Sequence, residues 1–185
     1  HDVALPLVGA TYANGYVKNK VMEFVGPGVA SLSADCRNGI DCMTTETTCW
    51  SSIWQTDGVT EEYLAGHGRA DAYKELKPAD VAYYDGCIEL DLSKIECMIA
   101  LPMHPSYAYP IRELKANAKD LLHEIETRAN EQLSGKVKMD LVSKVRADGS
   151  IYVDQGIVAG CSGGTYENLC AVADILRGKS CGNGE

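Results

Sequence analysis

The sequence predicts an α/β fold in which helices pack on a mixed sheet, and three observations support this. Short apolar runs at residues 21–25 and 88–92 have the length and alternation of strands. Residues 111–133 place apolar side chains at helical spacing, with charged residues on the opposite face. Strand-like and helix-like segments then follow one another in the order strand, helix, strand, strand, helix, strand, helix, which fits the α/β class.

The first strand, "VMEFV", is stopped by Gly26, Pro27 and Gly28, residues that favour a turn. Residues 31–46 contain Ser and Asp at capping positions, so we expect one or two short helices there. A further short helix is expected in "VTEEYLAGHGR", with Thr60 as its N-cap.

Two strands are expected within residues 81–102, because Ile88, Leu90 and Leu92 alternate there with acidic residues. The long helix 111–133 is stopped by Gly135. A basic, hydrophilic stretch at 136–150 then precedes a strand in "IYVDQGIVAG" and a last helix from Thr165 to about residue 177. We therefore divide the chain into a first domain, 1–140, that carries Glu23, and a second segment, 141–185.

The formal charge of −9 and the absence of a Lys/Arg run argue against nucleic acid, because phosphate binding needs clustered cations. No apolar run approaches the roughly 20 residues of a membrane-spanning helix, and a signal-peptide pattern is missing. We expect a soluble, cytoplasmic protein. Because the chain starts at His1 and not at Met, we also expect it to be a piece of a larger protein.

The sequence contains eight cysteines, and 45% of its residues are apolar. A chain that can build its own core does not need disulfides, so we expect reduced thiols. There is no Cys-x-x-Cys and there are only four histidines, so the spacing does not support a closed zinc site.

Cys161 stands where the apolar run 157–159 gives way to small residues and then to the last helix. A helix N-terminus favours a thiolate, and Ser162, Gly163 and Gly164 leave room for a ligand to approach the backbone. Cys161 could be a packing residue, a nucleophile or a cluster ligand. A nucleophile would need a base, and no His follows His123. Spacing alone leaves the choice open.

Glu23 shares one face of its strand with Val21 and Val25. It could be a functional carboxylate or an ordinary carboxylate on a solvent-facing sheet edge. The cysteines outside the Cys161 loop are interpreted as packing or surface residues: Cys36, Cys42, Cys49, Cys170 and Cys181.

The segment "AGCSGGTYENL" resembles the first cluster-ligand segment of the aconitase superfamily. The segments "VMEFVGPGV", "TTETTCWSSIWQTD", "GHGRADAYKEL" and "YYDGCIELDLSKIECMIALPMHP" follow the order of that family. The resemblance covers nearly the whole chain, and it implies part of an aconitase-like iron-sulfur domain.

Members of that superfamily are hydro-lyases that dehydrate and rehydrate hydroxy-polycarboxylates on a [4Fe-4S] cluster. The resemblance implies that Cys161 is the first metal-ligating cysteine, with Ser162 beside it in the cofactor site. It implies that Glu23 is the catalytic glutamate that hydrogen-bonds the water or hydroxyl on the cluster. This chain has Cys-Ser-Gly where the family commonly has Cys-Thr-Asn, and it lacks the paired ligand cysteines and the swivelling domain.

We therefore expect a segment of an aconitase-like hydro-lyase that is inactive alone and does not retain the cluster by itself. Its partners would be the remaining domains of the parent protein and a small hydroxy-polycarboxylate such as citrate or an isopropylmalate. The alternative is a cluster-free binding or regulatory domain derived from the same fold.

Overall fold

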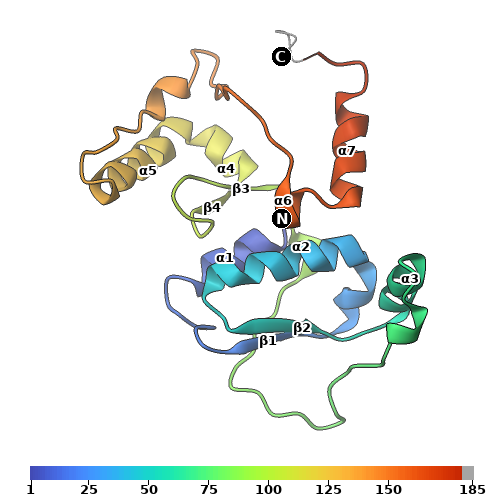
Figure 1. Ribbon diagram of the computed structural model, residues 1–185. Coiled ribbons are helices and arrows are strands. Elements are labelled where there is room, and N and C mark those ends of the chain that lie inside the picture. The colour runs from blue at the N-terminus through green and yellow to red at the C-terminus, as the bar shows by residue number, and fades with distance from the viewer. Residues whose placement is uncertain (181–185) are drawn as a thin grey trace. The chain divides into compact units, whose positions relative to one another are not determined.

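The computed structural model describes residues 1–180 and has a mixed α/β fold, with small parallel and antiparallel sheets and packed helices (Figure 1). The predicted fold class is confirmed. The helices are α1 (Ala4–Thr11), α2 (Ala34–Thr44), α3 (Gly58–Gly66), α4 (Ile111–Ala116), α5 (Ala118–Gln132), α6 (Gly160–Gly163) and α7 (Tyr166–Leu176). The strands are β1 (Val21–Phe24), β2 (Ser51–Trp54), β3 (Met98–Ala100) and β4 (Ala108–Pro110).

The chain folds into two compact units. Unit 1 comprises residues 1–18, 46–48 and 90–156, and unit 2 comprises residues 19–45, 49–89 and 157 onward. The predicted division into domains at residue 140 stays a prediction. Within residues 1–180, no helix is both long enough and apolar enough to cross a membrane.

Unit 2 is built on β1 and β2, which pair in parallel with Glu23 opposite Ile53. Parallel strands need a crossover connection, and α2 provides it by packing on β2. The β1 strand ends at Phe24, and the chain then turns at Gly26, whose φ of 105° only glycine adopts readily. Phe24 stacks on Trp54 with a ring-centroid distance of 4.2 Å, which joins the ends of the two strands.

An ion pair within unit 2 connects α2 to α3. The Ser33 hydroxyl caps α2 by accepting from the Cys36 amide, as the sequence predicted for this segment. One turn further, Arg37 donates to both carboxylate oxygens of Asp57, at 2.9 and 2.8 Å, and to the Val29 carbonyl. The Arg37 side chain is only 6% exposed, so this bidentate pair is part of the core of unit 2.

Unit 1 has an apolar core beneath the β3–β4 hairpin. Ile125 is completely buried, and it forms a cluster with Leu101, Leu114 and Leu122. The α1 helix packs on both strands of the hairpin and buries its own apolar residues, Leu5 and Val8 included. The amphipathic pattern predicted for 111–133 therefore produces the expected packing.

Residues 139–142 are attached to α5 by side-chain hydrogen bonds. Asn130 exchanges two bonds with the backbone of Met139, and the Glu126 carboxylate accepts from the Leu141 and Val142 amides at 2.8 and 3.2 Å. Because Val142 also packs against the core cluster, the segment after α5 is a packed part of unit 1.

Several predicted boundaries are wrong. The segment 88–92 is not a strand, and of the two strands expected in this region only β3 forms. The helix predicted for 111–133 is two helices, because Asn117 leaves the helical conformation at φ −130°. The N-cap of α3 is Asp57, which accepts from the amides of Val59 and Thr60, and not Thr60 itself.

The strand predicted in "IYVDQGIVAG" is reduced to one bridge between Ile151 and Val145. In contrast, α7 has the predicted bounds, with Thr165 as its N-cap residue. Its apolar residues Leu169, Ile175 and Leu176 remain exposed in the part of the chain that the structure describes.

Candidate functional site

Cys161 lies on α6, a single turn that immediately precedes α7, and its side chain is exposed. Gly160 starts this turn with φ +84°, a conformation that favours glycine. A Cβ atom at residue 164 would lie only 2.7 Å from the Gly160 carbonyl oxygen, so Gly164 is needed to close the turn. These two glycines therefore shape the backbone that presents the thiol.

The α6 turn is held against α2. The Ser162 hydroxyl donates to the Gly39 carbonyl at 3.0 Å. From α7, the side-chain amide of Asn168 donates to the Ser162 carbonyl at 3.1 Å. A Cβ on Gly39 would lie 3.5 Å from the Ser162 carbonyl oxygen, which is ordinary packing distance. Ser162, predicted to lie in the cofactor site, thus has a structural bond that fixes the position of Cys161.

Cys42 is the residue that the structure adds to this site. Burial raises the pKa of the Cys42 thiol, and hydrogen bonding to Cys161 raises it further. From the sequence, Cys42 was expected to be a packing or surface residue. The sequence does contain one indication of this arrangement. Gly39 and Cys42 are three residues apart on a predicted helix, so they share the face on which another segment can pack closely.

The other cysteines have separate environments. Cys36 and Cys49 are half-buried, and the Cys49 thiol donates to the Thr44 carbonyl at 3.4 Å. Cys170 is exposed on α7, where it forms a side-chain hydrogen bond with Tyr166. Cys181 lies outside the described residues.

The start of α7 is connected to the start of α2 by acidic side chains. The Glu167 carboxylate accepts from the Ser33 hydroxyl at 2.5 Å, and the Glu167 amide donates to the Asp35 carboxylate at 3.0 Å. Two consecutive segments, α6 and the first turn of α7, are thus hydrogen-bonded to one helix. This arrangement fixes the loop that carries Cys161.

Glu23 is half-buried on β1 and accepts a hydrogen bond from the Tyr84 hydroxyl at 2.6 Å. This bond, together with desolvation and the Glu23 charge, raises the pKa of Tyr84 above its usual value. Val21 and Val25 are exposed, so Glu23 lies on the more exposed face of the strand. Tyr84 could not be identified from the sequence, because it lies in a segment without regular secondary structure.

The described side chains provide only part of the donor set that a cluster needs. Among residues 1–180 there is no group of three or more His, Cys, Asp or Glu side chains arranged to hold a metal ion. The exposed thiol of Cys161 fits the role of one thiolate ligand. The described residues can therefore supply one ligand of a cluster, and they do not form a complete cluster site.

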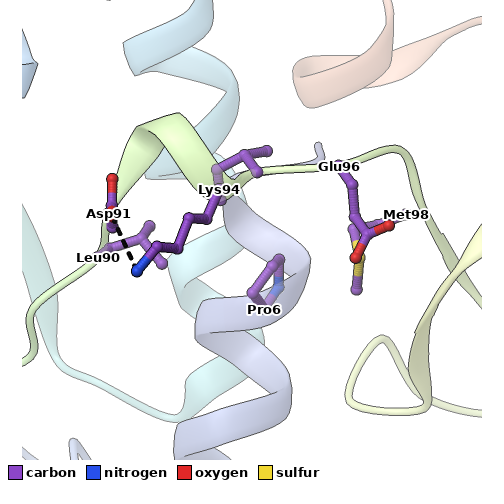
Figure 2. Close-up of a pocket in the computed structure, with 7 residues that line it drawn as sticks. Pro6, Leu90, Asp91, Lys94, Glu96 and Met98 are labelled. Atoms are coloured by element: carbon purple, nitrogen blue, oxygen red, sulfur yellow. Dashed lines mark ion pairs between the residues drawn. The ribbon is translucent and has the colours of Figure 1, made fainter.

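A hollow of about 330 Å³ lies elsewhere, in unit 1 (Figure 2). Apolar side chains such as Pro6, Leu90 and Met98 line it together with Glu96 and the Asp91–Lys94 ion pair. Glu23, Cys161 and Ser162 belong to unit 2, so this hollow is not the predicted site.

The fold and the site together define an α/β protein that presents an exposed thiol on a rigid turn and a hydrogen-bonded carboxylate in the same unit. The chain belongs to the aconitase family, because the family model (aconitate hydratase) matches residues 1–185. The resemblance in the sequence is confirmed.

The relatives are large subunits of dehydratases. The chain is 29% identical over 178 residues to the 2,3-dimethylmalate dehydratase large subunit of Eubacterium barkeri, which covers 96% of this chain and 34% of that protein. It is 28% identical over 183 residues to the 3-isopropylmalate dehydratase large subunit of Caldicellulosiruptor bescii, covering 99% of this chain and 34% of the relative. The 3-isopropylmalate dehydratase large subunit 1 of Pyrococcus furiosus is 29% identical over 178 residues, with coverage of 96% and 34%. The chain thus spans about a third of the length of these relatives.

Proposed function

We propose that this chain forms one part of an aconitase-like hydro-lyase that removes water from, and returns it to, a small hydroxy-polycarboxylate. The exposed thiol of Cys161, on a turn fixed by hydrogen bonds and within the family match, is the observation that carries this proposal. The relatives are dehydratases of isopropylmalate and dimethylmalate, so substituted malates are the first substrates to test.

In this proposal Cys161 supplies one thiolate to a [4Fe-4S] cluster, and the other ligands come from parts of the protein beyond this chain. When bound, the cluster supplies a Lewis acid for the hydroxyl that leaves the substrate. Ser162 holds the Cys161 turn on α2 through its bond to Gly39.

Glu23 is the proposed acid–base residue. A carboxylate at the edge of a site can accept or return a proton at its Oε atoms, and the Tyr84 hydroxyl donates to Oε2 at 2.6 Å. This hydrogen bond restrains the orientation of the Glu23 carboxylate.

The test is anaerobic reconstitution of the complete enzyme with iron and sulfide, followed by assays on isopropylmalate, dimethylmalate and citrate. We expect Cys161→Ser to lose iron, sulfide and activity, whereas Cys170→Ser keeps all of them. Glu23→Gln should keep the cluster and slow turnover by at least about tenfold.

Full cluster content and rate in Cys161→Ser would overturn the assignment of this cysteine. A complete protein that binds no cluster after reconstitution would favour the alternative, a binding or regulatory domain derived from the same fold.

A further inference from the structure

We propose that Cys42 and Cys161 form a reversible disulfide, which makes this pair an oxidative modification site within unit 2. The two thiols come from helices that are distant in the sequence and pack together, α2 and α6 (Figure 1).

The packing of the α6 turn brings Cys161 to the face of α2 that carries Cys42. Gly39 and Cys42 share one face of α2, and this face receives the α6 turn: Ser162 bonds to Gly39, and Cys161 contacts Cys42. The two backbones approach closely at Gly39, where an added Cβ would lie 3.5 Å from the Ser162 carbonyl oxygen. A disulfide needs Cα atoms within about 7 Å, and residues of α2 and α6 approach one another to within 8 Å between Cα atoms.

The two thiols also differ in accessibility. Cys161 is exposed, whereas Cys42 is half-buried behind it. An oxidant in solution therefore reaches Cys161 first, and Cys42 is placed to resolve the oxidised product. This is the arrangement of a reactive and a resolving cysteine.

With hydrogen peroxide as the oxidant, the Cys161 thiolate attacks one peroxide oxygen, the O–O bond breaks, and hydroxide leaves. The resulting sulfenic acid is attacked at sulfur by Cys42, so that the S–S bond forms, the S–O bond breaks, and water leaves. Overall, two thiols and one peroxide give one disulfide and two waters. A dithiol reductant reverses the reaction by thiol–disulfide exchange and is itself oxidised to its disulfide.

The consequence for the site rests on the proposed function. A sulfur atom within a disulfide is no longer a thiolate. Oxidation of the iron-free protein would therefore make Cys161 unavailable as a cluster ligand. The disulfide itself depends only on the contact between α2 and α6.

The chain provides closely matched controls. Trypsin cleavage after Arg37, Arg69, Arg146 and Arg177 yields peptides 38–69 and 147–177. The first contains Cys42 and Cys49, and the second contains Cys161 and Cys170. Because Cys49 and Cys170 have other hydrogen-bond partners, substituting them should leave the crosslink intact.

The experiment treats the iron-free 185-residue chain with hydrogen peroxide, blocks the remaining thiols with an alkylating agent, and maps tryptic peptides by mass spectrometry. We expect peptides 38–69 and 147–177 to be crosslinked in most molecules of the wild type, Cys49→Ser and Cys170→Ser. Cys42→Ser and Cys161→Ser should lose the crosslink, and dithiothreitol should release it from the wild type. Circular dichroism verifies that each variant is folded.

The proposal is overturned if Cys42→Ser retains the crosslink, or if oxidation yields only dimers between chains. Its failure is separable from failure of the proposed function. Loss of the cluster in Cys161→Ser without any Cys42–Cys161 crosslink would reject the disulfide alone, and a crosslink in a protein that never binds iron would reject the hydro-lyase alone.

Discussion

Arg37 and Asp57 form a bidentate ion pair that joins the first turn of α2 to the N-cap of α3. The carboxylate of Asp57 also caps α3 by accepting from the Val59 and Thr60 amides. The Asp57 carboxylate thus neutralises the buried Arg37 guanidinium and also accepts hydrogen bonds from the first amides of α3. The pair therefore connects α2 to α3 within the core of unit 2.

Removing the guanidinium should destabilise unit 2, because Asp57 and the Val29 carbonyl would lose a charged donor that is itself buried. We expect Arg37→Met to lower the free energy of unfolding by about 1–3 kcal/mol, since the Asp57 side chain is 24% exposed and water can replace part of the lost bonding. Both tryptophans, Trp50 and Trp54, belong to unit 2, so urea unfolding followed by their fluorescence measures this loss. Arg177→Met, which breaks an exposed pair, is the control and should show no resolvable change.

Acid should weaken unit 2 through the same carboxylate. The hydrogen bonds from Arg37, ahead of those from the α3 amides, hold the pKa of Asp57 below its usual value in the folded protein. Its stabilising effect is therefore complete above the unfolded pKa of about 4 and is lost as the pH falls through the lower folded pKa. The urea midpoint should fall as the pH is lowered through this window. Asp57→Asn should have a flatter profile there, and an identical slope in both proteins would contradict the role of Asp57.

The α6 turn should not tolerate a side chain at residue 164. A Cβ there would lie 2.7 Å from the Gly160 carbonyl oxygen, so the turn must open in Gly164→Ala. We expect a cost of about 1–3 kcal/mol in unit 2, together with faster alkylation of Cys161. Gly156→Ala is the matched control, because no atom lies within 4 Å of its added Cβ. Equal alkylation rates in the two variants would contradict the tight turn.

In unit 1, Glu126 should protect the segment that follows α5. Its carboxylate is the acceptor for the Leu141 and Val142 amides, and Glu126→Ala removes that acceptor. Hydrogen exchange at these two amides should become roughly tenfold faster, which corresponds to the loss of about 1.4 kcal/mol of protection. Glu131→Ala changes an exposed residue on the same helix and should leave the exchange unchanged.

Local sequence signals predicted the elements that local interactions determine. Ser33 caps α2, because a cap depends only on the next three amides. Thr165 is the N-cap residue of α7 at the predicted position, and its side chain makes no capping hydrogen bond. The break at Asn117 was missed, since the apolar spacing continues through it while its backbone leaves the helix. Asn favours non-helical conformations, but its effect depends on tertiary packing.

Strands were harder to predict, because a strand exists only where a partner strand lies beside it. The alternation of Ile88, Leu90 and Leu92 has no such partner in the structure of residues 1–180. In contrast, the hydroxyl-rich segment Ser51–Trp54 becomes β2, since β1 pairs with it about 30 residues away along the chain.

The candidate site was predicted in part for the same reason. Sequence patterns indicated Cys161 and Glu23, whose catalytic and ligand roles stay predictions. Their partners, Cys42 and Tyr84, could not be identified, because each contact joins segments far apart in the sequence.

The bond between Ser162 and Gly39 spans 123 residues, and it has a consequence for biosynthesis. While the ribosome is still translating the intervening residues, the face of α2 around Gly39 has no α6 to cover it. Unit 2 therefore reaches its native packing only after residue 162 has left the exit tunnel, and a nascent chain arrested before that point exposes a surface that chaperones can bind.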